Sequence, residues 1–445
     1  MPSAAETLAV LRAAAQPLET AADRARLVDR LRGASVVLIG ESTHGTQDFY
    51  ALRAQLTQEL IERGGFSAVA IEGDWPDAYR VNRYVQHTGP ELDAVAALGG
   101  FARFPTWMWR NTAVADFVAW LRAHNAAIRY PGRRVGFYGL DLYSLHASMR
   151  AVVEYLETKD PAAARAARAS YACFEEFGTE TDTYAWAALD RGEGPCADAV
   201  ARELAALRER RTALLSRDGP SASDEYFHAV QNARLAANAE HYYRTMLGGR
   251  VSSWNLRDRH MAETLEELRA HLRTRGQPPK VVVWAHNSHV GDARATELGA
   301  SGELTLGQLV RERHGHDCRL VGLTTHSGRV MAANDWGLPG FVQEVRPALP
   351  GSQEALFHAT GLPRFFLPFP AGSAAHAFGM TPRLERAIGV IYRPDTERRN
   401  HYFESRLAER FDVVVHLDVT APVEPLEPVA AVRDDEPPET YPSGV

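Results

Sequence analysis

Four short apolar segments, each leading to an ionisable residue, place the strongest constraint on how this 445-residue chain can fold. The segments and the residues they lead to are ASVVLIG before Glu41, FSAVAI before Glu72, RRVGFYG before Asp141 and KVVVWA before His286. Segments as apolar as these are typical of strands buried on both faces of a parallel sheet. Because parallel strands end at one edge, where ligands bind, we expect the four polar clusters to meet at one site.

Predicted helices alternate with these strands, which indicates an α/β fold with a layered core, in which a mostly parallel β-sheet is flanked by helices. Between Asp141 and Lys280 the sequence shows only helical patterns, so a large helical insertion interrupts the core. Three more strands are predicted at CRLVGLTT (318–325), AIGVIYR (387–393) and FDVVVHLD (411–418). The predicted division is 1–142 and 276–425 for the two parts of the α/β core, 143–275 for the helical insertion, and 426–445 for a flexible, Pro-rich and acidic tail.

The charge pattern bears on the partners that such a chain can bind. The net charge of -7 is spread along the sequence without a basic block, so neither nucleic acid nor an anionic membrane is expected to bind. No apolar run approaches the roughly 20 residues that a membrane span needs. A small neutral or polar molecule is the expected substrate, and no protein partner can be inferred.

The cysteines and lysines exclude several kinds of chemistry. The three cysteines are Cys173, Cys196 and Cys318, an odd number with no Cys-x-x-Cys spacing, so we expect no disulfide framework, a reducing compartment and a cytoplasmic protein. The only lysines are Lys159 and Lys280, and Lys280 opens a strand at the end opposite the polar clusters. Schiff-base and P-loop lysine chemistry are therefore not expected.

The turn GESTHG carries the leading candidate for a general base, His44. A predicted amphipathic helix follows at once, and the positive end of its dipole disfavours a protonated histidine and keeps a neutral imidazole available. The simpler interpretation makes His44 a surface residue of a turn whose hydroxyl residues cap the helix, namely Ser42, Thr43 and Thr46.

Two glutamates accompany this histidine at the predicted sheet edge. Glu41 and Glu72 end apolar strands, where a buried carboxylate is costly unless a histidine, an arginine or a metal compensates it. A single such glutamate can simply cap a helix or form a surface ion pair, but a pair beside His44 favours a site. Arg53, in the helix after the turn, could orient one of the carboxylates, although a lone arginine on a helix is usually solvated.

The fourth strand leads into WAHNSHV, in which His286 and His289 are three residues apart. Such a pair suits either metal binding or the stabilisation of developing charge. Together with His44 and Glu72 it would supply enough ligands for zinc or manganese, so a divalent metal stays an open alternative, although the leading interpretation needs no cofactor.

Further residues are candidates for contact with the substrate. Arg257 can bind a carboxylate or an oxyanion bidentately. The remaining candidates lie near the ends of the second and third strands or in a tryptophan-rich segment, and they are Asp74, Trp109, Asp141 and Tyr143. Most tryptophans on amphipathic helices belong to the core, which is the simpler interpretation of Trp109.

Five motifs in order, GESTHGTQDFYALR, IEGDWPDAYRVNRY, FPTWMWRN, GFYGLDLYSLHAS and VVVWAHNSHVGDAR, give the chain its resemblance to the erythromycin esterase family. The resemblance runs from near residue 20 to about residue 425. It implies an α/β layered core with a helical domain above it, and a hydrolase of a macrolide lactone or a related ester. The best-known members of the family open macrolide lactones by activating water, without an acyl-enzyme serine. The family's site residues then correspond to Glu41, His44, Arg53, Glu72, His286 and His289.

These residues suggest a mechanism and two alternatives. His44, polarised by Glu41 or Glu72, would take a proton from water while His289, His286 or Arg257 stabilises the oxyanion. The first alternative is a metal-dependent hydrolase of another small ester or amide, with zinc or manganese on His44, Glu72, His286 and His289. The second is a non-catalytic protein that binds haem, a metal or another small ligand.

Overall fold

The computed structural model describes residues 3–177, 181–191, 194, 196–215, 222–246 and 249–428. The strands of its main sheet are β1 (Gln16–Pro17), β2 (Val36–Ile39), β3 (Ala68–Asp74), β4 (Gly136–Asp141), β5 (Val281–Trp284), β6 (Cys318–Ala332), β7 (Phe341–Val345), β8 (Arg364–Pro368) and β11 (Val413–Thr420). Their order is β1-β8-β11-β6-β2-β5-β3-β4, and β7 pairs with β6. The sheet is parallel from β11 to β4, with antiparallel pairing at β8, β1 and β7.

The four strands that carry the polar clusters are neighbours in this sheet, in the order β2-β5-β3-β4. Val36 of β2 is aligned with Val281 of β5, and Val281 with Ala68 of β3, so these strands start level with one another. Because they run parallel in this register, their carboxyl ends share one edge. The predicted α/β class and the mostly parallel sheet are confirmed.

Alternate residues of these strands face two separate cores. Val36, Leu38, Val281 and Val283 belong to one core, and the intervening residues, such as Val37, belong to the other. The second core is covered by α2 (Ala21–Leu31), α3 (Gln47–Gly64), α4 (Trp75–Val85) and α6 (Thr112–Ala126). Burial on both faces explains why these strands show continuous apolar runs with no polar alternation.

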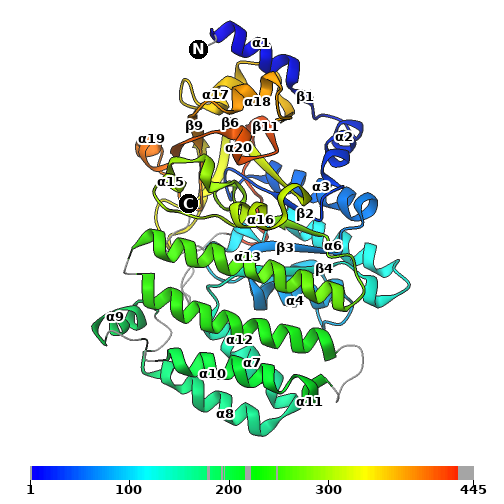
Figure 1. Cartoon of the computed structure of the whole chain (residues 1–445), viewed down its shortest axis with the longest axis vertical. Coiled ribbons are helices and arrows are strands. Elements are labelled where there is room, and N and C mark those ends of the chain that lie inside the picture. The colour runs from blue at the N-terminus through cyan, green and yellow to red at the C-terminus, as the bar shows by residue number, and fades with distance from the viewer. Residues whose placement is uncertain are drawn as a thin grey trace.

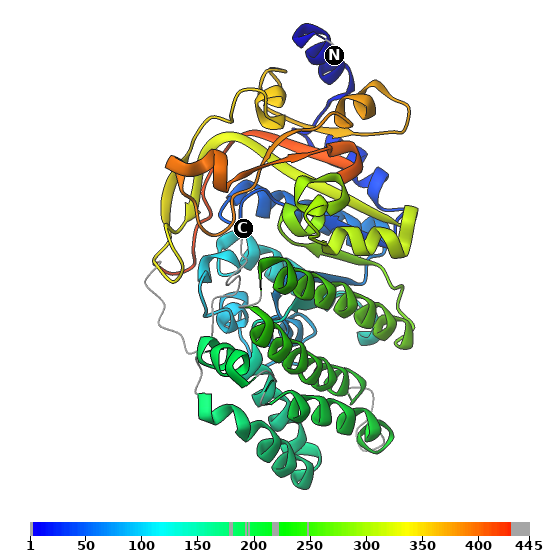
Figure 2. The same cartoon turned by 60° about the vertical axis from the view of Figure 1, so that its left-hand side comes forward.

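The helices of residues 145–274 cover the first core and extend away from it. They are α7 (Leu145–Lys159), α8 (Pro161–Tyr171), α9 (Thr181–Arg191), α10 (Ala197–Glu209), α11 (Arg211–Leu215), α12 (Ala222–Thr245) and α13 (Arg250–Thr274). In Figure 1, α13 lies nearest the sheet, and α12, α7 and α8 follow in rows farther from it. Figure 2 shows the same stack below the sheet after rotation, with the N-terminal α1 (Ala4–Ala14) at the opposite end.

Shorter helices and a two-stranded ribbon complete the second half of the chain. The helices are α14 (Asn287–Val290), α15 (Glu297–Ala300), α16 (Leu306–His314), α17 (Gln353–His358), α18 (Ala374–Gly379), α19 (Glu397–Asn400) and α20 (Leu407–Arg410). One further short helix, α5 (Ala94–Ala97), belongs to the first half. The ribbon pairs β9 (Arg383–Arg386) with β10 (Tyr402–Ser405) in antiparallel fashion.

One strand prediction was wrong. Residues 387–393 form only isolated bridges, in which Ile388 pairs with Thr43 and Ile391 with Ala333. The segment is apolar because it packs against the turn of Thr43 and beside β6, and burial without a continuous ladder produces the same apolar pattern as a strand. Of the predicted tail, residues 429–445 lie outside the described part of the chain.

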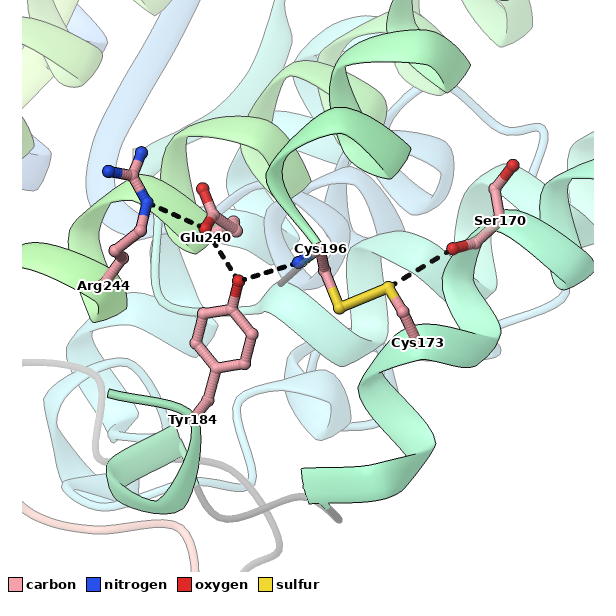
Figure 3. Close-up of a disulfide and its surroundings, with 6 residues drawn as sticks. All are labelled: Ser170, Cys173, Tyr184, Cys196, Glu240 and Arg244. Carbon is pink, nitrogen blue, oxygen red and sulfur yellow. Dashed lines mark hydrogen bonds and ion pairs between the residues drawn. A yellow bond between two sulfur atoms is a disulfide. The ribbon is translucent and has the colours of Figure 1, made fainter. Parts of the chain in front are cut away.

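The expectation of no disulfide was also wrong, because Cys173 is bonded to Cys196, 23 residues along the chain. The disulfide links the segment after α8 to the start of α10 (Figure 3). Cys318 is free and buried. Tyr184, beside it, accepts a hydrogen bond from the Cys196 backbone N–H at 3.3 Å and donates one to Glu240 at 2.7 Å. This pairing depends on how helices pack, which cysteine spacing does not reveal.

In the described residues, no helix is long and apolar enough to cross a membrane.

Candidate active site

His44 lies in the turn between β2 and α3, and a glutamate and an arginine fix its orientation. Its Nδ1 is 3.0 Å from Oε1 of Glu41, and Oε2 of Glu41 is 2.8 Å from Nη2 of Arg53. All three side chains are almost fully buried, and the Arg53 guanidinium also lies over the rings of Tyr50 and Trp284. Since a carboxylate only accepts, Nδ1 of His44 carries a proton, so in the neutral ring Nε2 is the nitrogen with the lone pair.

The two glycines of the GESTHG turn allow this close packing. A Cβ at Gly40 would lie 2.0 Å from Oδ1 of Asn287, and a Cβ at Gly45 would lie 1.8 Å from the Met331 carbonyl oxygen. Any larger residue at either position would push the turn away from α14 or β6. The glycines therefore hold His44 against the end of the sheet, and the interpretation of His44 as a surface turn residue does not fit its burial.

Arg257, on α13, joins the ends of β3 and β4. Its Nη2 donates to Glu72 at 2.7 Å and to Asp141 at 2.6 Å, and its Nε donates to Asp141 at 3.0 Å. The guanidinium also lies 5.0 Å from the ring centre of Tyr143. These contacts bring the helical segment and the sheet edge together at one buried cation.

His289 occupies the space between Asp258 and Glu72. Its Nδ1 is 2.9 Å from Oδ2 of Asp258, its Nε2 is 3.2 Å from Oε1 of Glu72, and its ring stacks on Trp254 with centroids 4.5 Å apart. Burial by itself would lower the pKa of His289, but the carboxylates of Asp258 and Glu72 raise it to about 9. The raised pKa favours a protonated ring between the two carboxylates, and Nη1 of Arg257, 3.0 Å from Nε2 of His289, acts against it.

His286 is held in the opposite state. Burial, reinforced by the neighbouring His44, holds the pKa of His286 well below its usual range, so the ring is neutral. The ring centroids of His44 and His286 are 4.8 Å apart. The backbone N–H of His286 donates to Oε2 of Glu72 at 2.7 Å, which ties this histidine to the Arg257 cluster.

The nitrogen of His286 that could act on a ligand is Nε2. The Ser288 backbone N–H donates to Nδ1 of His286 at 3.2 Å, and the Ser288 hydroxyl lies 2.8 Å from the same nitrogen. Because Nδ1 accepts, the ring proton resides on Nε2, which is buried and has no hydrogen-bond partner of ordinary geometry among the described residues. The Ser42 carbonyl accepts the Ile388 N–H at 2.7 Å, and its second lone pair also favours a proton on the His286 ring.

The predicted alternative set of metal ligands, His44, Glu72, His286 and His289, does not converge on one point in this arrangement. Glu72 binds Arg257, and His289 lies between two carboxylates. Within the described ranges, no group of three or more histidine, cysteine, aspartate and glutamate side chains is arranged to hold a metal ion.

Two candidates for substrate contact border this polar cluster and have partners of their own. Asp74 forms an ion pair with Arg103 and accepts the Ser144 backbone N–H at 3.1 Å. Trp109 is fully buried and packs against Tyr50 and Phe101. Asp141, Tyr143 and Arg257 do join the cluster.

The sequence interpretation missed three residues that touch the candidate histidines. Asp258 and Trp254 contact His289, and Ser288 contacts His286. Trp254, Arg257 and Asp258 have helical i, i+3, i+4 spacing, which places them on one face of α13. Because Arg257 was already a candidate, this spacing could have identified Trp254 and Asp258 from the sequence.

A small cavity adjoins the cluster from the side of Trp254 and Ser288. Its volume is about 180 Å³, and its wall includes both of these residues together with Tyr402 and Phe403. His44 and His286 are each only 1% exposed, so water can reach them far more easily than a large substrate can.

A sequence profile of the erythromycin esterase family matches residues 61–420. The chain belongs to this family. The resemblance seen in its motifs is thereby confirmed, and family membership supports a hydrolase.

An erythromycin esterase type II from Escherichia coli is 22% identical over 310 residues, which cover 67% of this chain and 70% of that protein. A putative hydrolase, YbfO of Bacillus subtilis, is 21% identical over 430 residues, which cover 92% of this chain and 90% of that protein.

Solved structures share the fold of this family member. A Bacillus cereus protein superposes with a TM-score of 0.77 at 19% identity, and the match covers 96% of this chain and 100% of that chain. An erythromycin esterase mutant in its open conformation superposes with a TM-score of 0.63 at 19% identity, covering 91% of this chain and 96% of that chain.

Proposed function

We propose that the chain hydrolyses a carboxylic ester, with a macrolide lactone as the leading candidate, by using His44 to activate water. The observation that carries the proposal is the buried contact of Glu41 with Nδ1 of His44 at 3.0 Å. It leaves Nε2 as the basic nitrogen and stabilises the imidazolium that forms when this nitrogen takes a proton. The proposal requires no cofactor, nucleic acid, membrane or protein partner.

His286 supplies the donor for the developing negative charge in this proposal. Arg257 and His289 are already paired with Glu72 and other carboxylates, so their charge is largely neutralised. The Nε2–H of His286 has no such partner and lies on a ring 4.8 Å from that of His44. A neutral, preorganised donor in a buried site can stabilise an oxyanion without first breaking an ion pair.

The reaction then has balanced steps. Nε2 of His44 takes a proton from water while the water oxygen bonds to the ester carbon, and the carbonyl electrons move to the oxygen that faces His286. As the carbonyl re-forms, the bond to the alcohol oxygen breaks, and the proton on His44 passes to that oxygen. The products are an acid and an alcohol, joined in one chain if the substrate is a lactone.

Family membership and the E. coli erythromycin esterase relative support a macrolide as the substrate. The cavity beside the site, at about 180 Å³, is smaller than the ~300–1,000 Å³ usual for drug-sized ligands. A macrolide would therefore have to widen the approach to His44, whereas a small ester would not.

Mass spectrometry of erythromycin and of a series of simple esters, incubated with the purified protein, tests this function. We expect a product heavier by one water, or the separated acid and alcohol, with the unmutated protein and a loss of about 10²–10⁴-fold with His44→Ala. The half-buried His228, which stacks on Tyr79, is a control histidine outside the site, so His228→Gln should remain active. Equal turnover by the unmutated protein and His44→Ala would overturn the proposal.

A further inference from the structure

Ser288 lies between His286 and the cavity beside the cluster. Its hydroxyl is 2.8 Å from Nδ1 of His286, and its own backbone N–H lies 3.2 Å from the same nitrogen. Ser288 is only 7% exposed, and what is exposed lines the cavity of about 180 Å³. One residue thus directs two donor groups at one ring nitrogen.

Two donors on Nδ1 select one of the two neutral forms of the imidazole. In that form the proton is on Nε2, and Nδ1 carries the lone pair. The other form would direct the Nδ1 proton at the Ser288 N–H and would leave Nε2 as an acceptor. Since His286 is buried and neutral, the choice between these forms decides whether its free nitrogen donates or accepts.

The orientation of the ring is also fixed from the backbone. His286 caps the N-terminus of α14, and its backbone N–H is held by Glu72 at 2.7 Å. The carbonyl of the next residue, Asn287, accepts from Arg410 at 2.8 Å. With the main chain restrained on both sides, the remaining variable is the position of the ring proton, and the Ser288 contacts act on it from the Nδ1 side.

We propose that Ser288 is a positioning residue that holds His286 in the form protonated at Nε2, so that this nitrogen donates to the substrate oxyanion. The catalytic part rests on the proposed function, whereas the position of the proton does not. Ser288 itself touches neither the substrate nor the attacking water. Its hydroxyl acts through His286, whose reactive nitrogen lies on the other side of the ring.

Three substitutions separate this role from simple packing. Ser288→Thr keeps the hydroxyl and should keep activity. Ser288→Ala leaves only the backbone donor, and the loss of one neutral hydrogen bond should lower kcat by about tenfold at unchanged KM. Ser288→Asp offers a carboxylate that accepts from Nδ1, so the proton should leave Nε2 and kcat should fall about 10²–10³-fold, as when an oxyanion donor is removed.

The ¹⁵N chemical shifts of the histidine rings report the proton position directly, and the His286 signals are identified by their absence from His286→Gln. We expect a protonated Nε2 and an unprotonated Nδ1 in the unmutated protein and in Ser288→Thr, and the reverse in Ser288→Asp. A protonated Nδ1 in the unmutated protein would overturn the proposal, as would a fully active Ser288→Asp. If no ester is cleaved by the unmutated protein, the proposed function fails, but the ¹⁵N shifts still decide the role of Ser288.

Discussion

Replacing Glu41 by glutamine should affect stability and activity through two different partners. Glu41 accepts from Nδ1 of His44 at 3.0 Å and lies 2.8 Å from Nη2 of Arg53. Glutamine keeps the size of the side chain but removes its charge. Arg53 is fully buried, and Glu41 is its one ion-pair partner within the described residues. Leaving such a cation uncompensated should lower the free energy of unfolding by about 3–5 kcal/mol.

The loss of activity has a separate cause. A glutamine amide can donate to Nδ1 of His44, which moves the ring proton to Nε2 and removes the base, and it no longer stabilises the imidazolium. We therefore expect Glu41→Gln to lower kcat by about 10²–10⁴-fold.

The double variant Glu41→Gln/Arg53→Met separates the two effects. Methionine fills much of the volume beside Tyr50 and Trp284 without a charge, so most of the lost stability should return while activity should not. Urea denaturation followed by fluorescence measures the first quantity, and steady-state ester hydrolysis measures the second. Recovery of activity in the double variant would refute the assigned role of Glu41, and an unchanged stability of Glu41→Gln would refute the burial argument.

Three further perturbations test the ion pairs and the disulfide. Arg257→Met leaves two buried carboxylates without their shared cation, so urea denaturation should show a loss of about 3–5 kcal/mol, and a neutral result would contradict the assigned ion pairs. His289 has a pKa of about 9 against an ordinary value of about 6.5, so its stabilising contribution is complete below pH ~6.5 and is lost as the pH rises through ~9. His289→Gln should therefore cost more stability at the lower pH, and an equal cost at both would argue against a raised pKa. Cys173→Ser/Cys196→Ser should cost about 2–4 kcal/mol, and alkylation of the unreduced, unfolded protein should label one cysteine, whereas three labels would show that no disulfide forms.

The sheet edge could be predicted because it depends on local pattern and on general rules of topology. Apolar runs marked β2, β3, β4 and β5, and parallel pairing requires that their carboxyl ends lie together. Their order along the sheet, and so the proximity of Glu41 to His286, is a property of the folded chain. The motifs also identified His44, His286 and His289 as candidates, but they did not show which side chain each histidine contacts.

Contacts that depend on packing between distant segments could not be predicted in this way. Asp258 contacts His289 only because α13 packs across the sheet edge. In the sequence, the rest of α13 and strand β5 lie between the two residues. Residues 387–393 look like a strand because they are buried, yet they form only isolated bridges. The pairing of Cys173 with Cys196 likewise follows from helix packing rather than from cysteine spacing.

In the proposed reaction His44 activates water, and Ser42, two residues before it, is not a nucleophile. The most direct test compares His44→Ala with Ser42→Ala on whichever ester the unmutated protein cleaves, while intact-protein mass spectrometry follows the enzyme during turnover. We expect Ser42→Ala to retain hydrolysis, His44→Ala to lose it, and no acylated protein to accumulate. Loss of hydrolysis in Ser42→Ala, together with an acyl adduct on the unmutated protein, would contradict the proposed reaction.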